Sequence, residues 1–234
     1  MRALLFDCDG VLVDTERDGH RVAFNRAFAE KGLDVVWSVS QYGKLLGVAG
    51  GKERMRHYFD MYGWPPLADH ETFIQELHRC KTDRFMEIID VGQLPFRPGV
   101  ARLAQDAAVA GLKLAVCSTS NERAVTRIVQ HLVQSNPAVR FNLLLAGDMV
   151  AKKKPHPEIY ALASARLGVP STECVVIEDS RNGLLAAKAA GMRCVITTSG
   201  YTTGEDFAEA DGVFSELGDP PTVQVTLAYL KELT

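Results

Sequence analysis

The sequence predicts an α/β fold, a doubly wound parallel sheet with an inserted helical domain. Apolar runs of strand length alternate with helix-length segments after residue 92, and such alternation produces a parallel sheet through right-handed crossovers. A first apolar run lies at residues 3–6, and the stretch that follows it is helical in character without a strong strand. We therefore predict a core of residues 1–15 and 92–234, and a helical cap of residues 16–91.

The composition excludes several classes of protein. The chain has 234 residues, 47% of them hydrophobic and 24% charged, as is typical of a globular protein. A net charge of −3 gives no general electrostatic reason to bind nucleic acid or an anionic membrane. The apolar runs are too short for a transmembrane helix, and a strand beginning at residue 3 leaves no room for a signal peptide. No stable protein partner is indicated.

The number and spacing of the cysteines indicate the redox environment of the protein. Five are present, an odd number, and none forms a CxxC pair. This usage predicts a reducing, cytoplasmic environment, with buried thiols rather than zinc ligands.

The cap is expected to contain four helices, at residues 16–31, 40–46, 52–61 and 70–90. Asp14 and Thr15 are candidates to cap the first of them. The glycine-rich turn at residues 47–52 places backbone amides beside Lys52 at a helix start, which suits an anion. An ordinary glycine turn is the alternative, just as Lys81 in the last helix would ordinarily be a solvated charge.

The core elements alternate strand and helix, with glycine and proline at their boundaries. After residues 3–6, we expect strands at 112–117, 143–146, 174–177, 193–197 and 213–214. Helices are expected at 98–110, 122–132, 158–167, 184–190 and 222–233.

Two carboxylates, Asp7 and Asp9, follow the first strand. In an extended backbone Cys8 points to the opposite side, so both carboxylates share one face. At about 4 Å they would repel by roughly 4 kcal/mol at an effective dielectric constant of about 20. A metal ion, or a proton held on one of them, must offset this repulsion. The pair therefore predicts a site of chemistry.

Polar groups also follow three other strands: Ser118, Lys154 and the pair Glu178 and Asp179. Each has an ordinary alternative, such as a helix cap or a solvated lysine. Together they lie where parallel α/β sheets bind their ligands, at the carboxyl ends of the strands. The carboxylates provide oxygen ligands for Mg²⁺, and the hydroxyl and ammonium suit a phosphoryl group. The set predicts phosphoryl transfer to a carboxylate.

Four segments resemble the signatures of the haloacid dehalogenase-like phosphohydrolases. They are FDCDGVL, the serine of CSTSNE, the Lys-Pro of KKKPHP, and IEDSRNG. The resemblance covers the whole chain, including the position of the cap, and implies a Rossmann-like core. It implies that Asp7 is the nucleophile that becomes an aspartyl-phosphate. It also implies that Asp9 protonates the leaving alcohol and then activates water.

The same resemblance assigns the remaining groups. It implies that Ser118 and Lys154 bind the transferred phosphoryl group, and that Lys154 also keeps the nucleophile ionised. The implied Mg²⁺ ligands are Asp7, the main-chain oxygen of Asp9, and Asp179. Glu178 is expected to orient a metal-bound water.

Within the family, the run FDCDGVLVDTERDGHRVAFN resembles the CbbY xylulose-1,5-bisphosphate phosphatases. These remove one phosphate from an inhibitor of Rubisco in the Calvin cycle and release xylulose 5-phosphate. The resemblance implies cationic groups for a second phosphate and polar groups for sugar hydroxyls. The predicted substrate-binding residues are Glu16, His20, Lys52, Lys81, Thr119 and Asn121.

Two alternatives stay open at this point. One is a phosphosugar mutase similar to β-phosphoglucomutase, although the corresponding cap turn of that mutase carries an arginine rather than Gly-Gly-Lys. The other is a non-catalytic sugar-phosphate sensor, which would not need the nucleophile and acid that are present here.

Overall fold

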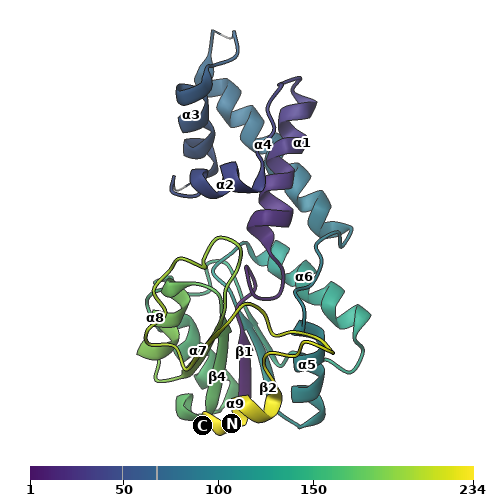
Figure 1. Ribbon diagram of the computed structural model, residues 1–234, viewed down its shortest axis with the longest axis vertical. Coiled ribbons are helices and arrows are strands. Elements are labelled where there is room, and N and C mark those ends of the chain that lie inside the picture. The colour runs from purple at the N-terminus through teal and green to yellow at the C-terminus, as the bar shows by residue number, and fades with distance from the viewer. Residues whose placement is uncertain (49, 67) are drawn as a thin grey trace. The chain divides into compact units, whose positions relative to one another are not determined.

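The computed structural model describes residues 1–48, 50–66 and 68–234 (Figure 1). Internal contacts divide the chain into two compact units. The core unit comprises Met1–Asp14 and Pro95–Thr234, and the cap unit comprises Thr15–Leu94.

The core unit is built on one sheet in which every pairing is parallel. In the described part of the chain this sheet has six strands, in the order β3-β2-β1-β4-β5-β6. Their bounds are β1 Ala3–Phe6, β2 Lys113–Cys117, β3 Leu143–Leu145, β4 Cys174–Glu178, β5 Arg193–Thr197 and β6 Gly212–Phe214. The predicted doubly wound parallel sheet with a helical insert is confirmed.

Strand β1 lies at the centre of the sheet, between β2 and β4 (Figure 1). All four of its residues are buried, as expected for a parallel strand covered on both faces. Its Leu4 is in register with Leu114 of β2 and with Val175 of β4. The chain adds strands first on the β2 side of β1 and then on the β4 side. This change of direction places a ligand-binding crevice at the carboxyl end of β1.

Helices cover both faces of the sheet. On one face, Ile159 and Leu184 share a buried cluster with Leu5 and Val176. The other face contacts α5, which in turn contacts α9. The helices are α5 Val100–Val109, α6 Glu122–Ser135, α7 Glu158–Leu167, α8 Arg181–Ala189 and α9 Leu227–Glu232.

The last helix is shorter than predicted: it begins at Leu227 rather than at residue 222. The hydroxyl of Thr226 caps it by accepting a hydrogen bond from the amide of Tyr229. Just before the cap, the amides of Gln224 and Val225 both donate to the carbonyl of Leu217. Because these two amides already donate to Leu217, they cannot make the hydrogen bonds of a helix that begins earlier.

The cap unit is helical. A π-helical turn at Thr15–His20 leads into α1 Arg21–Glu30, followed by α2 Val39–Leu45, α3 Gly51–Tyr62 and α4 His70–Asp90. Ser38 and Asp69 cap α2 and α4 by accepting from the amides of Gln41 and Thr72.

Aromatic rings form the interior of the cap unit. Trp37 is fully buried, with its ring centroid 4.8 Å from those of both Phe24 and Phe28. Ala49, within the glycine-rich turn predicted to bind an anion, lies outside the described residues. Among the residues that the structure describes, no helix combines the length and the apolar character needed to cross a membrane.

Candidate active site

Polar residues from β1, β2, β4 and the loop after β3 converge on a cavity of about 230 Å³ in the core unit. The cavity is lined by Asp7, Asp9, Ser118, Thr119, Ser120, Lys154, Asp179, Ser180 and Asn182. The structure therefore brings together all the predicted strand-end groups; Glu178 is not in the lining, but its buried carboxylate contacts Lys154.

Lys154 links the carboxylates of β1 and β4. Its Nζ lies 2.5 Å from Oδ1 of Asp7 and 2.6 Å from Oε1 of Glu178, and it donates to the carbonyl of Cys117 at 3.0 Å. The side chains of Asp7, Lys154 and Glu178 are each less than a tenth exposed. An ammonium group has three N–H donors, and these three acceptors position Lys154 beside the carboxylate of Asp7.

Glu178 is surrounded by hydrogen-bond donors. Besides Lys154, its Oε1 accepts from the hydroxyl of Tyr160 at 2.7 Å. Its Oε2 accepts from the amide of Asp179 at 3.1 Å and the hydroxyl of Ser180 at 3.3 Å. A Cβ on Gly183 would lie 1.9 Å from this carboxylate, so only glycine allows α8 to pack so closely. These contacts make Glu178 an anchor for Lys154.

Asp9 is held by two serines of the loop after β2. Its Oδ2 accepts from the hydroxyl of Ser118 at 3.2 Å and from the hydroxyl of Ser120. The amide of Ser120 in turn donates to Ser118 Oγ at 3.1 Å. We did not predict Ser120 as a site residue, although it belongs to the same Ser-Thr-Ser-Asn run as Ser118. Asn121 uses its side-chain oxygen to cap α6 through the amide of Ala124.

Three buried carboxylates form a candidate metal centre. One oxygen from each of Asp7, Glu178 and Asp179 lies within 4.8 Å of the others. Carboxylate oxygens are the ligands that Mg²⁺ prefers, so the donor set fits this ion. The side chain of Asp9 is not part of this group; the main-chain oxygen of Asp9 stays a predicted ligand.

The electrostatics of the site show an excess of negative charge. Burial raises the pKa of Asp7 to about 8; Lys154 lowers it, while Glu178 and Asp9 raise it further. Burial, followed by Glu178 and Asp7, raises the pKa of Asp179 well above its usual value. Burial disfavours the ammonium of Lys154, but the two neighbouring carboxylates outweigh this and raise its pKa. Lys154 thus lowers the pKa of Asp7, but by less than burial raises it. A cation bound beside Asp7 would supply the further positive charge that favours the ionised carboxylate.

Three of the predicted cap residues have polar partners within the cap unit. Lys81 Nζ lies 3.0 Å from Nδ1 of His20. Oε2 of Glu16 accepts from the hydroxyl of Tyr42 at 2.6 Å, and this hydroxyl accepts from Arg54 at 2.9 Å. Both Lys81 and Arg54 are 8% exposed, which is unusual for cations.

Two further cations of the cap unit are Arg54 and Lys52. Arg54 was not predicted; its place three residues after Gly51, at a helix start, was the only signal in the sequence. Lys52 is half-buried in the first turn of α3, where its charge acts on His78 and Glu71.

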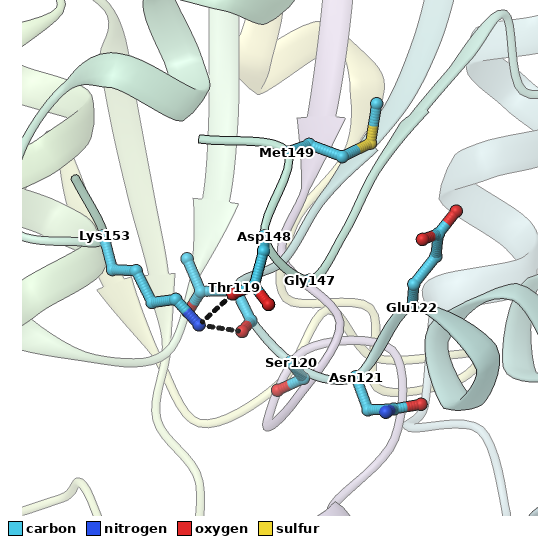
Figure 2. Close-up of a pocket in the computed structure, with 8 residues that line it drawn as sticks. All are labelled: Thr119, Ser120, Asn121, Glu122, Gly147, Asp148, Met149 and Lys153. Atoms are coloured by element: carbon cyan, nitrogen blue, oxygen red, sulfur yellow. Dashed lines mark hydrogen bonds and ion pairs between the residues drawn. The ribbon is translucent and has the colours of Figure 1, made fainter. Parts of the chain in front are cut away.

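A second cavity, of about 510 Å³, adjoins the first and shares Thr119 and Ser120 with it. Figure 2 shows Lys153 pointing toward Asp148, with Nζ 3.1 Å from Oδ1, and toward the carbonyl of Thr119. Half of the Lys153 side chain is exposed, so the lysine triplet contains a solvated member directly before the buried Lys154.

Comparisons of the sequence with known proteins agree with this geometry. A family model described as haloacid dehalogenase-like hydrolase matches residues 1–191. A CBBY-like protein of Arabidopsis thaliana is 54% identical over 236 residues, covering 99% of this chain and 74% of that protein. Protein CbbY of Rhodobacter capsulatus is 42% identical over 222 residues, covering 95% of this chain and 96% of that protein.

Solved structures of CbbY are also similar to this chain. CbbY from Rhodobacter sphaeroides in complex with phosphate is 40% identical, with a TM-score of 0.71 and coverage of 97% of this chain and 98% of that one. A mutant of that protein in complex with xylulose-(1,5)bisphosphate is 39% identical, with the same TM-score and coverage.

Proposed function

Because this chain belongs to the haloacid dehalogenase-like hydrolase family, we propose that it is a magnesium-dependent phosphatase that converts xylulose 1,5-bisphosphate to xylulose 5-phosphate. The predicted resemblance to this family is confirmed by the family model and by the CbbY relatives. The observation that carries the proposal is the buried contact of Asp7 with Lys154, beside the carboxylate of Asp179.

In the proposed first step, a carboxylate oxygen of Asp7 attacks phosphorus. The phosphorus–oxygen bond to the sugar breaks, and Asp9 donates a proton to the departing oxygen. Ser118 and Lys154 bind the transferred phosphoryl group. Catalysis of phosphoryl transfer consists almost entirely of positioning and charge stabilisation. The products of this step are the free alcohol and a phosphorylated Asp7.

In the second step, Asp9 removes a proton from water, and the water oxygen attacks the phosphorus of the aspartyl-phosphate. The bond between phosphorus and Asp7 breaks, which releases inorganic phosphate and restores the carboxylate. The two serine hydroxyls that hold Oδ2 of Asp9 support this role, because a general acid and base must be held within reach of both oxygens.

The metal would be held by Asp7, Asp179 and the main-chain oxygen of Asp9. When bound, Mg²⁺ neutralises charge on the phosphoryl oxygens. Glu178 contributes by anchoring Lys154 and, as the sequence predicts, by orienting a metal-bound water.

The choice of a bisphosphate rests on the cap residues and on the relatives. Lys81 and Arg54 are buried cations, and we propose that Lys81 binds the second phosphate, with Lys52 as a further candidate. Glu16, His20, Thr119 and Asn121 would bind sugar hydroxyls. The CbbY mutant structure contains xylulose-(1,5)bisphosphate, which supports this substrate class for a relative at 39% identity.

A phosphate-release screen tests the proposal. Pentose and hexose mono- and bisphosphates are incubated with the enzyme and Mg²⁺, and free phosphate is quantified. We expect xylulose 1,5-bisphosphate to give the highest kcat/KM, with one phosphate released per molecule. Equal rates on all substrates would reduce the assignment to a general phosphatase, and isomerised sugar phosphate without free phosphate would indicate a mutase.

Removing the hydroxyl of Ser120 is expected to slow the reaction. In Ser120→Ala, Asp9 loses one of the two hydroxyl donors to its Oδ2. A hydrogen bond to a charged group contributes about 1.5–3 kcal/mol, so we expect kcat to fall by about 10- to 150-fold with KM little changed. Steady-state kinetics measure this, and Ser215→Ala, on the loop after β6, is the control. Unchanged kcat in Ser120→Ala would mean that the Ser120 hydroxyl does not position Asp9 for catalysis.

The pH dependence of kcat/KM should show whether the charge of Lys81 contributes to binding the bisphosphate. Burial lowers its pKa to about 8; Glu16 opposes this shift, and Arg54 adds to it. As the pH rises through this value the ammonium loses its proton, so kcat/KM for the bisphosphate should fall by about tenfold on the alkaline side. In Lys81→Arg the guanidinium stays charged, and the decline should disappear. An identical alkaline decline in both proteins, or with a monophosphate, would contradict the role of Lys81.

A further inference from the structure

We propose that Arg97 is a positioning residue that holds Asp179 in place for metal binding, by fixing the two backbone segments that contact this carboxylate. The inference rests on the proposed function, because it requires that Asp179 binds Mg²⁺. In this proposal Arg97 acts through the backbone, because its guanidinium donates to four carbonyls.

Arg97 ties together segments that are far apart in the chain. Its guanidinium donates to the carbonyls of Gly10, of Thr197 at 3.0 Å, of Thr198 at 2.8 Å and of Ser215 at 2.7 Å. These residues lie 87 to 118 positions away in sequence. The guanidinium therefore joins the loop after β1 to the ends of β5 and β6.

Two of these segments contact Asp179 directly. Gly10 has a φ of +78°, and a Cβ on it would lie 2.0 Å from Oδ2 of Asp179, so its backbone packs against the carboxylate. Ser199, two residues after β5, also acts on Asp179: burial raises the pKa of this carboxylate, and Ser199, as a side-chain hydrogen-bond partner, has the smaller, opposite effect of lowering it. Ser199 immediately follows the two carbonyls of Thr197 and Thr198 that Arg97 holds. Asp179 is thus confined between two segments that share one anchor.

The chemistry of arginine explains why this residue type suits the position. Its planar guanidinium presents five donors in a fixed fork and stays charged. A lysine has three donors around a single nitrogen and cannot reach carbonyls on opposite sides with the same geometry. Partners that orient metal ligands typically change metal affinity by about 10- to 100-fold when they are mutated.

Arg102 offers a matched control on the same part of the chain. Its guanidinium also donates to several carbonyls, those of Leu217 at 3.1 Å, Gly218 at 2.8 Å and Val225 at 2.9 Å. None of these residues lines the catalytic cavity. Arg102→Lys removes the same kind of contact without touching the segments around Asp179.

The test is a direct titration of the full-length protein with Mg²⁺ by calorimetry, without substrate, for wild type, Arg97→Lys and Arg102→Lys. We expect the Kd of Arg97→Lys to rise by about 10- to 100-fold, and that of Arg102→Lys to stay within about twofold while its Tm falls. At saturating Mg²⁺ the KM of Arg97→Lys should match that of wild type, which a general loosening of the fold would not produce.

Other outcomes overturn the inference. An unchanged Kd in Arg97→Lys, or an equal rise in Arg102→Lys, would show that Arg97 has no specific role. Should Arg97→Lys fail to fold, Ser199→Ala decides: a raised Kd supports the confinement of Asp179, and an unchanged Kd overturns it. Absence of saturable Mg²⁺ binding to wild type would instead overturn the proposed metal-dependent function, and the inference with it.

Discussion

Asp7→Asn is expected to lower kcat by at least on the order of 10⁴-fold, the scale seen when a nucleophile is removed from a catalytic unit. An amide is a poor nucleophile and cannot form the acyl phosphate. The fold should persist, because Lys154 keeps its ion pair with Glu178 at 2.6 Å and the asparagine oxygen can still accept its hydrogen bond. The variant should therefore bind substrate without turning it over.

The measurement combines phosphate release with rapid chemical quenching and mass spectrometry of the protein. Wild type should show a transient phosphorylated species that Asp7→Asn does not form. Asp106→Asn, an exposed carboxylate on α5, is the control and should keep wild-type kinetics. Near-normal hydrolysis by Asp7→Asn, with the melting temperature of wild type, would remove Asp7 from the mechanism.

Lys154→Met is expected to affect both catalysis and stability. Its ammonium balances two buried carboxylates, those of Asp7 and Glu178, and breaking a buried pair by removing one partner costs about 3–5 kcal/mol. The same change removes a cation from the phosphoryl group, so kcat should fall by about 10²- to 10³-fold.

The stability loss should depend on pH with a defined sign. Burial already raises the pKa of Asp7 to about 8, and removing Lys154 raises it further. A carboxyl group with a raised pKa in the folded state costs stability when it must be ionised, so the deficit should be larger at alkaline than at acidic pH.

Urea unfolding of wild type and Lys154→Met at about pH 5 and about pH 9.5 measures this difference, because the two proteins differ in the ionisation of Asp7 only above its wild-type pKa of about 8. Lys153→Met is the control for stability, because the neighbouring side chain is half exposed and exposed ion pairs contribute little. A deficit in Lys154→Met that does not change with pH, or an equal deficit in Lys153→Met, would argue against the buried ion pair as its cause.

Much of the fold could be predicted because its signals are local. A short apolar run bounded by glycine, such as residues 3–6, favours a buried strand, and β1 and α4 have the predicted bounds of residues 3–6 and 70–90. The predictions fail where a tertiary contact competes with the helix pattern, as at the start of α9, where Leu217 binds the amides of Gln224 and Val225.

The candidate site likewise contains residues that the sequence predicts and residues that only the tertiary structure reveals. The sequence by itself determined the groups at the strand ends, because the carboxyl ends of parallel strands meet at one edge of a sheet. That argument places Asp7, Ser118, Lys154 and Asp179 together before any coordinate is known.

The supporting residues were decided only by the tertiary structure. Tyr160 and Arg97 have no distinguishing local pattern. Ser120 and Arg54 have weak local signals, which do not indicate the partner that each of them contacts. Arg97 binds carbonyls up to 118 positions away. Such contacts depend on where loops of different strands come together, and this is a property of the packed chain.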